Sequence, residues 1–338
     1  MTRRDVMTAP GISPRESDLL LAAATAAPSL HNSQPWVFEV TGRVVDLYAD
    51  PSRQLSHTDP DGRELLVSCG AALLNLRVAA AYLGYEAHAR LLPDAGLATW
   101  LARVELTGRS RHAGMAAALY DAITLRHTNR QPFEDRPVPR DAADALVEAA
   151  SLESAELSLV THEAERARLV SLVHQADLQR DLDPGLATEA ARWTGVPAGR
   201  DDGVPGYALG PLAHDAGAAV RDLRRGAPVP DRPVARFEHA PTLGVLATRH
   251  DDRESWLRAG QALERVLLAA TVQGLSASFL NQPLEASNLR WLVRDPLRGI
   301  GFPQMVLRLG YGPQVPPTPR RSLDEVVRHA AEAAAPGS

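Results

Sequence analysis

Two segments far apart in the chain carry the same pattern of small and apolar residues, and this repeat restricts the folds that the chain can adopt. Residues 70–85 read GAALLNLRVAAAYLGY, and residues 260–275 read GQALERVLLAATVQGL. Without a gap, the identical pairs are Gly70 and Gly260, Ala72 and Ala262, Leu73 and Leu263, Ala79 and Ala269, Ala80 and Ala270, and Gly84 and Gly274. Both segments have helical spacing and end at a glycine suited to a helix C-cap. A chance likeness between two amphipathic helices explains this register less well than duplication.

The surroundings of the two helices extend the repeat. A strand-like stretch follows each helix, WLARVELTG (100–108) in the first half and QMVLRLGYG (304–312) in the second. The helix-like residues 18–29 have a counterpart in residues 144–155. A chain of 338 residues is long enough for two domains. We therefore predict an α+β fold with antiparallel or mixed central sheets flanked by helices. Its halves would be residues 1–110 and 111–338.

Each half contains a polar motif that the other lacks. In the first half, PSLHNSQPW (28–36) connects the first predicted helix to a strand-like stretch. In the second half, TLRHTNRQPF (124–133) precedes the first helix, where the first half has only TAPGISPRES (8–17). Two half-sites of this kind can meet at the junction of the halves and form one complete site.

The second-half motif has the chemistry of an anion site. In an extended segment, Arg126, Thr128 and Arg130 point to one side. Two guanidinium groups around a hydroxyl suit a terminal phosphate, and each charge-assisted bond is worth about 1.5–3 kcal/mol when shielded. Arg320 and Arg321 in PPTPRRSLDEV form a second arginine pair for the same anion. A solvated helix end and a pair that merely precedes the last helix explain the same residues, and the sequence leaves both interpretations open.

The first-half motif restricts its own backbone. Pro28 and Pro35 stand on either side of its polar residues. Asn32 and Gln34 each offer two donors and an acceptor, enough to recognise the edge of a planar heterocycle. A capped turn with Trp36 buried in the core explains the same residues. In the first interpretation the loop binds a ring whose phosphate lies at the arginine motif of the other half.

Composition excludes several classes of function. A net charge of −5 makes nucleic acid and anionic membranes poor partners. All 36 residues counted as Lys+Arg are arginine, so the chain has neither a pyridoxal Schiff-base lysine nor a Walker lysine. The single cysteine, Cys69, excludes internal disulfides and thiolate zinc sites. No HExxH, GxSxG or GxGxxG motif occurs, and we expect no metal site.

The N-terminal residues and the apolar runs predict a cytoplasmic protein. MTRRDVMTAPGISPRESD (1–18) has no apolar core of the kind found in signal peptides. The most apolar stretches are interrupted by arginine or asparagine before they reach the length of a bilayer span. We therefore expect no segment that crosses a membrane.

The motifs together resemble the nitroreductase family of flavin proteins, specifically its Acg-like branch with two fused nitroreductase-type halves. AAPSLHNSQPW (26–36) is close to the signature of that branch. LRHTNRQPF (125–133) resembles the family's phosphate motif, with Thr128 where serine is common and His127 where a second arginine often stands. The resemblance extends over about residues 15–330 and includes TPRRSLDEV (318–326).

The resemblance implies a tandem duplication of the nitroreductase-type fold, in which one chain imitates the dimer of ordinary members. It implies one FMN per chain, because each half has kept only one of the two motifs, and it favours a monomer. The phosphate would bind Arg126, Thr128, Arg130, Arg320 and Arg321. The ribityl chain and ring would lie along Pro28, Ser29, Leu30, His31, Asn32 and Gln34. Ser278 in GLSASFLNQP (274–283) is a further candidate contact, and no catalytic residue is identified.

Residues 183–236, called the insertion below, have no counterpart in the first half. Their content of glycine, proline and charge fits a disordered surface segment. Trp193 and Tyr207 are aromatic anchors that a linker does not need. In the Acg-like branch, the corresponding segment looks like a lid folded over the flavin.

Two functions follow from the resemblance. In the first, NAD(P)H reduces the bound FMN, which then reduces a nitroaromatic, quinone or similar acceptor by ping-pong turnover. In the second, the insertion covers the flavin so completely that the protein stores or sequesters it with little reductase activity. The first is favoured, because polar side chains such as Asn32 and Gln34 would be costly to keep around an inert ring.

Overall fold

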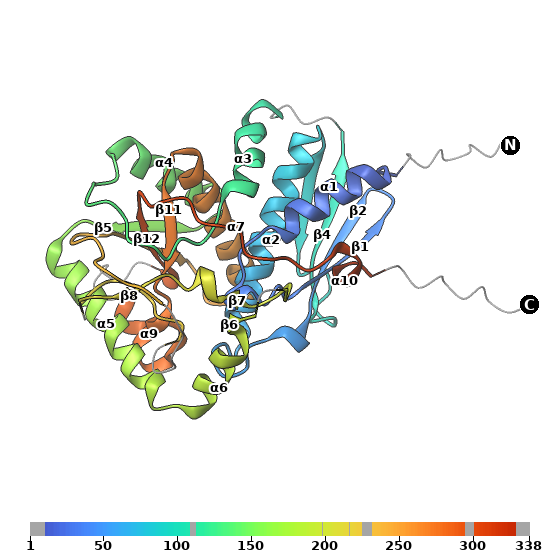
Figure 1. The fold of residues 1–338 in the computed structure, drawn as a ribbon. Coiled ribbons are helices and arrows are strands. Elements are labelled where there is room, and N and C mark those ends of the chain that lie inside the picture. The colour runs from blue at the N-terminus through green and yellow to red at the C-terminus, as the bar shows by residue number, and fades with distance from the viewer. Residues whose placement is uncertain are drawn as a thin grey trace, which may run out of the picture.

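The computed structural model describes residues 11–108, 113–197, 199–215, 217–224, 232–294 and 301–328, and two four-stranded antiparallel sheets dominate it (Figure 1). The N-terminal sheet has the order β1-β2-β4-β3, with β1 (Trp36–Thr41), β2 (Val44–Ala49), β4 (Trp100–Thr107) and β3 (Glu86–Leu91). The C-terminal sheet has the order β5-β10-β12-β11, with β5 (Glu156–Val160), β10 (Thr242–Thr248), β12 (Phe302–Gly310) and β11 (Ser276–Phe279). The strand-like stretches predicted after each repeated helix are β4 and β12.

The two sheets follow the same order of elements. In the N-terminal half, α1 (Pro14–Thr25) precedes β1 and β2, and α2 (Arg63–Tyr82) precedes β3 and β4. In the C-terminal half, α4 (Arg140–Ser151) precedes β5 and β10, and α7 (Arg253–Val272) precedes β11 and β12. In both sheets, the strands that come first and third along the chain are the edge strands: β1 and β3 in the N-terminal sheet, and β5 and β11 in the C-terminal sheet. The corresponding strands therefore take corresponding places in the two sheets.

The two repeated helices, α2 and α7, pack directly against each other in the centre of the molecule (Figure 1). A Cβ atom on Gly70 would lie 2.2 Å from the carbonyl oxygen of Leu257, and one on Gly260 would lie 2.0 Å from that of Val67. Only glycine allows two backbones to approach so closely. The first pair of identical residues in the repeat thus marks the crossing point of the helices.

Helix α2 is long and apolar enough to cross a membrane by length and composition, contrary to the expectation from its interrupting Asn75 and Arg77. In the structure, 83% of its most apolar window is buried inside the protein. A buried central helix of a folded protein has this composition because it faces apolar neighbours on all sides. Its apolar character is therefore explained by the core.

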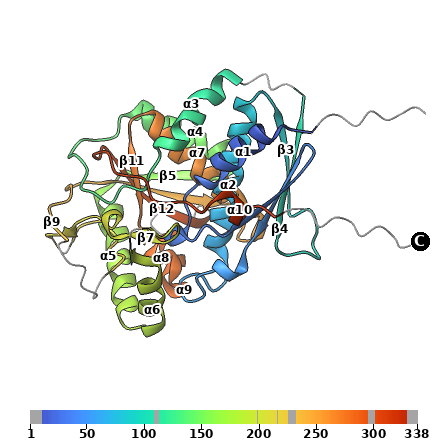
Figure 2. The ribbon, with the colours of Figure 1, turned by 45° about the vertical axis from the view of Figure 1, so that its right-hand side comes forward.

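The C-terminal residues return to the N-terminal half (Figure 2). Helix α10 (Leu323–Val326) lies beside α1 and β1, and Val326 belongs to the same hydrophobic core as Phe38. Helix α3 (Ala113–Leu125) also packs against α2 and contributes Ile123 to that core. Both segments belong to the predicted second half, so elements of the second half complete the core of the first half. The boundary near residue 110 stays a prediction.

The insertion forms short elements over one side of this junction. It includes α6 (Pro184–Trp193), β6 (Thr194–Val196), β7 (Val204–Pro205), η3 (Gly206–Ala208), β8 (Leu212–Ala213) and β9 (Val234–Ala235). The remaining elements are η1 (Leu30–Asn32), η2 (Pro51–Arg53), α5 (Glu163–Asp181), α8 (Gln282–Glu285) and α9 (Ser287–Arg294). Trp193 is buried, with the guanidinium groups of Arg53 and Arg200 at 5.8 and 5.9 Å from its ring. The predicted aromatic anchor therefore packs against the N-terminal half.

Candidate functional site

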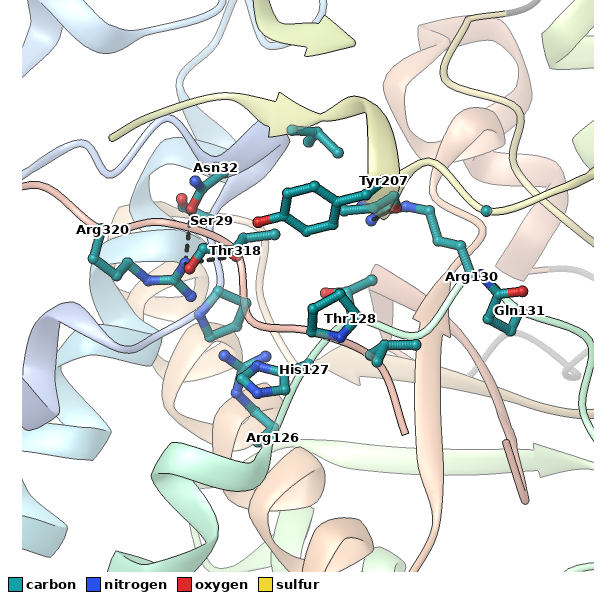
Figure 3. A pocket seen from close by; sticks show the side chains of 16 residues that line it. Ser29, Asn32, Arg126, His127, Thr128, Arg130, Gln131, Tyr207, Thr318 and Arg320 are labelled. Atoms are coloured by element: carbon teal, nitrogen blue, oxygen red, sulfur yellow. Dashed lines mark hydrogen bonds between the residues drawn. The ribbon is translucent and has the colours of Figure 1, made fainter. Parts of the chain in front are cut away.

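A cavity of about 650 Å³ lies where the end of α1, the segment after α3 and the C-terminal segment meet (Figure 3). We call it cavity 1. Seven residues predicted from the two motifs and the C-terminal arginine pair line it: Pro28, Ser29, Asn32, Arg126, Thr128, Arg130 and Arg320. The fold therefore brings two motifs from different halves of the sequence into one site.

Cavity 1 is positively charged. Three arginines line it, and no aspartate or glutamate is among its described lining residues. Burial lowers the pKa of Arg320 to about 9, and neighbouring Arg126 lowers it further. Burial followed by the charges of Arg221 and Arg232 lowers the pKa of Arg130 to about 10. These cations remain protonated at neutral pH but lack a counterion in the cavity, so an anion would stabilise them.

The C-terminal end of α1 holds two of these arginines. Arg320 donates through Nε to the carbonyl of Thr25 at 2.9 Å and through Nη2 to that of Ala26 at 3.0 Å. Arg126 donates through Nη2 to the same Ala26 carbonyl at 2.9 Å. The last carbonyls of a helix lack intrahelical partners and carry the negative end of its dipole. This helix end therefore stabilises two like charges side by side.

The loop after α1 has an unusual backbone. His31, Asn32 and Gln34 have φ angles of 47°, 57° and 51°, in the left-handed region. Each such non-glycine residue costs on the order of 1–3 kcal/mol, so the surroundings must stabilise it. The backbone N–H of Gln34 donates to Ser29 Oγ at 2.9 Å. The restriction predicted from the two prolines is therefore reinforced by hydrogen bonds within the loop.

The amide side chains of this loop contact the insertion and the C-terminal segment. Asn32 Nδ2 donates to the carbonyl of Gly203 at 2.9 Å, and Gln34 Nε2 donates to that of Asp201 at 2.8 Å. Gln34 Oε1 accepts a hydrogen bond from the backbone N–H of Arg321 at 2.8 Å. Gln34 is completely buried and lines neither cavity described here. Its amide thus joins protein segments, where the sequence suggested contact with a heterocycle.

The insertion covers cavity 1. Its Tyr207 lies across the cavity in Figure 3, and the hydroxyl donates to the carbonyl of Pro317 at 2.8 Å. Arg130 Nη1 donates to the carbonyl of Ala208 at 2.9 Å. These residues of the insertion are thus folded against the site, and the role of the insertion as a lid over the flavin stays a prediction.

A second cavity, cavity 2, of about 600 Å³ adjoins the first, because Pro28, Ser29, Thr128 and Arg130 line both. Its apolar lining comes from both halves and the insertion: Leu30, Val67, Leu223, Leu263, Phe279 and Met305. An apolar chamber joined to a cationic one suits a ligand with a planar ring at one end and an anionic group at the other.

Buried polar groups also line cavity 2. His31 is 5% exposed, and within the described part of the chain neither ring nitrogen has a hydrogen-bond partner. Burial, with the charges of Arg221, Arg180 and Arg130, lowers the pKa of His31 well below its usual value, so the imidazole is neutral. Burial raises the pKa of Glu64 to about 7. Unpartnered ring nitrogens such as those of His31 can bind the polar edge of a ligand, whereas Glu64 accepts a hydrogen bond from Arg63 Nη2 at 2.8 Å.

Two further predicted residues lie outside both cavities. Ser278 is buried in β11 and accepts a hydrogen bond from Arg308 Nη1 at 3.4 Å, whereas the adjacent Phe279 lines cavity 2. Successive side chains of a strand point to opposite faces, which separates these two. Arg321 binds the backbone oxygen of Gln34 through Nη1 at 3.3 Å. Cofactor contacts through Ser278, Arg321 and Gln34 stay predictions.

Several lining residues were not predicted from the sequence. They are His127, Thr318 and Tyr207 in cavity 1, and Glu64, Ser68, Arg221 and Asn281 in cavity 2. Asn281 could have been found, because it lies in the segment 274–283 already singled out. Arg221 carries no sequence signal, since it lies in an insertion whose fold depends on tertiary contacts.

Comparison with known proteins gives consistent results. A sequence model described as "Nitroreductase family" matches residues 123–311. "Putative NAD(P)H nitroreductase Rv3131" of Mycobacterium tuberculosis is 36% identical over 91% of this chain and 90% of its own length. "Putative NAD(P)H nitroreductase acg" of the same organism is 32% identical over 90% of this chain and 92% of its own length.

Among solved structures, the FMN-dependent nitroreductase NfnB from Mycobacterium smegmatis in complex with NADPH matches 64% of this chain and 100% of its own, with 19% identity and a TM-score of 0.41. A likeness at this level places no residue of the site. The family match and the two relatives confirm the resemblance inferred from the motifs. The chain belongs to the nitroreductase family.

Proposed function

We propose that this protein is an FMN-dependent oxidoreductase that accepts reducing equivalents from NAD(P)H and transfers them to a nitroaromatic, a quinone or a similar acceptor. The observation that carries the proposal is the pair of adjoining cavities, one lined by three arginines and the other by apolar side chains together with the unpartnered His31. Family membership and the names of the two relatives support the activity class.

The residues present fit FMN. The phosphate would bind in cavity 1, where Arg126, Arg130 and Arg320 provide charge and Thr128 provides a hydroxyl. The isoalloxazine ring would occupy cavity 2, where the unpartnered nitrogens of His31 can bind a polar ring edge. The three arginines that line cavity 1, with no aspartate or glutamate among its described lining residues, are the property of this structure that a phosphate satisfies.

When bound, FMN supplies the hydride chemistry, and the protein supplies binding, orientation and electrostatics. The neutral His31 offers a hydrogen bond without adding charge to the ring site. The cation Arg130 at the cavity 2 lining favours negative charge that develops on a bound ring or acceptor, whereas the charge of Arg221 is paired with the Glu285 carboxylate. NAD(P)H and the acceptor would use cavity 2 in turn, which is the requirement of ping-pong turnover.

We further propose that the two halves arose by tandem duplication, that one chain replaces the family's dimer, and that it binds one FMN. The equivalent strand orders and the crossing of α2 and α7 at repeated glycines support this proposal. In the second half, the segment that follows α4 is equivalent to the end of α1 in the first half. There Glu153 accepts hydrogen bonds from Arg77 Nη1 at 2.6 Å and Arg265 Nε at 2.8 Å. This ion cluster occupies the position where a second phosphate would bind.

A second function, flavin sequestration, is favoured by the contacts of the insertion with Asn32, Arg130 and the Pro317 carbonyl. The test is anaerobic mixing of the FMN-loaded protein with NADH, NADPH or dithionite, followed by absorbance. An oxidoreductase is bleached by a reduced nicotinamide and recovers its colour with menadione or nitrofurazone. Bleaching by dithionite alone, both in the intact protein and with residues 190–230 shortened, contradicts the proposal and favours sequestration. A colourless protein that ignores added FMN contradicts both.

A further inference from the structure

A carboxylate lies buried directly behind the arginines of cavity 1. Glu264 of α7 is 0% exposed, and its Oε1 lies 3.3 Å from Arg126 Nε. Within the described part of the chain, neither carboxylate oxygen of Glu264 has a hydrogen-bond partner, and neither has Arg126 Nε. A buried carboxylate is expensive unless it is paired and hydrogen-bonded. The pair is therefore close but incompletely satisfied.

The groups that face Glu264 come from several elements. Arg126 and His127 follow α3, and Arg320 belongs to the C-terminal segment. Burial followed by the charges of Arg126 and Arg320 lowers the pKa of His127 to about 4, so His127 adds no charge at neutral pH. From α2, Asn75 interacts with the Glu264 side chain, and its own Oδ1 is buried without a partner.

The remaining polar residues near Glu264 on α7 are engaged elsewhere. Gln261 accepts a hydrogen bond from Arg77, and Arg265 binds Glu153. From the end of α1, the neighbouring polar groups are carbonyls that already accept hydrogen bonds from these arginines and from Asn75 Nδ2. Arg126 therefore has one acidic neighbour on its buried side, Glu264, and an open cationic cavity on the other.

We propose that Glu264 is the internal counterion of this anion site, and that binding of a phosphate group in cavity 1 is coupled to protonation of Glu264. The identity of the phosphate ligand as FMN rests on the proposed function. A phosphate dianion and the Glu264 carboxylate compete for Arg126 and repel each other. A proton taken from solvent removes that repulsion.

The proposal fixes the sign of the pH dependence. Burial raises the pKa of Glu264 to about 7, opposed by Arg126, Asn75 and Arg320. A bound dianion raises this pKa further. Proton uptake on binding therefore occurs at pH values between the pKa of Glu264 in the free protein, about 7, and its higher pKa in the complex. The phosphate itself has a second pKa of about 6, and binding as the dianion releases a proton below that range. The two effects therefore have opposite signs and separate pH ranges.

The test is calorimetric titration of the apoprotein with FMN in pairs of buffers that differ in ionisation enthalpy, from about pH 6 to 8, which stays below the pKa of Arg320, about 9. We expect the wild type to take up more protons above about pH 7 than Glu264→Gln does, by as much as one, because Glu64 of cavity 2, whose pKa is also about 7, is present in both proteins. In the same range the wild-type affinity falls more steeply with rising pH than the variant affinity, by at most about tenfold per unit. Glu153→Gln, which alters a buried glutamate away from cavity 1, keeps the wild-type uptake.

Equal uptake by the wild type and Glu264→Gln overturns the proposal, and so does a wild type without uptake above about pH 7. If the variant does not fold, the wild type is titrated with inorganic phosphate, which lacks the ring that cavity 2 and its Glu64 would face, and the presence or absence of uptake above about pH 7 decides the matter. If the protein binds no FMN, the proposed function fails, and inorganic phosphate replaces FMN as the probe. Proton uptake with inorganic phosphate then supports the coupling independently, and its absence overturns it.

Discussion

Gly70 and Gly260 touch each other across the α2–α7 crossing in a reciprocal way. The Cβ position of Gly70 lies 3.0 Å from the Cα of Gly260, and the Cβ position of Gly260 lies 2.8 Å from the Cα of Gly70. The Cβ position of Gly70 also meets the carbonyl oxygen of Leu257, three residues before Gly260. The Cβ position of Gly260 meets the carbonyl oxygen of Val67, three residues before Gly70. Such a reciprocal contact is what two equivalent helices make around a local twofold axis.

Replacing either glycine by alanine should therefore destabilise the whole molecule. The added methyl groups meet backbone atoms that cannot move aside without separating the helices. We expect Gly70→Ala and Gly260→Ala each to lower the free energy of unfolding by about 1–3 kcal/mol or more. Urea unfolding of the apoprotein measures this. Gly217→Ala, at a position with open space, is the matched control and should change little.

Arg130 offers a direct test of the anion site. Its Nη1 donates a hydrogen bond to the Ala208 carbonyl, and its charge is opposed by those of Arg221 and Arg232. Arg130→Gln should weaken FMN binding about 10- to 100-fold, because a shielded charge-assisted bond is worth about 1.5–3 kcal/mol. Riboflavin, which lacks the phosphate, should bind both proteins equally. Fluorescence titration measures both ligands, with the exposed Arg90→Gln as control; equal loss for riboflavin would contradict a phosphate contact.

The stability of the apoprotein should depend on pH through Glu264. Its pKa is raised in the folded state from 4.5 to about 7, so folding favours the protonated form. The folded state then binds more protons than the unfolded chain, and this contribution to stability is lost as pH rises from about 4.5 through 7. The loss is at most about 1.4 kcal/mol per pH unit. Urea unfolding at pH 5.5 and 7.5 should therefore show a smaller decrease for Glu264→Gln than for the wild type. Parallel decreases would mean that Glu264 is not the titrating group.

The sequence predicted the central helices and the meeting of the two motifs because these depend on patterns that a chain carries locally. The repeat of Gly70 and Gly260 reports a backbone contact, and only glycine permits that contact. The side chains of Arg126 and Arg130 are charged, so they must pair with an anion or face solvent. In each case the residue type alone limits the environment that it can occupy.

The rest of the site depends on partners that the sequence does not identify. Gln34 has an amide suited to a heterocycle, yet the fold places Asp201 and Arg321 beside it. In the sequence, Glu264 is one charged residue of a helix with amphipathic spacing. Its burial follows from the segments that pack over α7. The insertion has strands of only two or three residues, so its position is set by contacts between segments and not by periodicity.

The assembly of the protein is predicted from its internal contacts. Under the proposed duplication, the α2–α7 packing within one chain would take the place of the packing between two chains. We therefore expect a monomer, with a molar mass near the 36.4 kDa of the chain. Light scattering coupled to gel filtration measures this over a range of protein concentrations. A dimer that dissociates only on unfolding would contradict the prediction.

Tyr207 should control how fast the flavin leaves. Its ring lies across cavity 1 and its hydroxyl joins the insertion to the Pro317 carbonyl, although the side chain is 52% exposed. Removing the ring opens a path from the phosphate to solvent, and changes of this kind act mainly on the dissociation rate. We expect Tyr207→Ala to accelerate FMN release by about tenfold, and Tyr207→Phe, which loses only the hydroxyl bond worth about 0.5–1.5 kcal/mol, to have a smaller effect. Release is followed by the recovery of flavin fluorescence after dilution. If both variants release FMN at the wild-type rate, the ligand leaves by another route, past Arg221 and cavity 2.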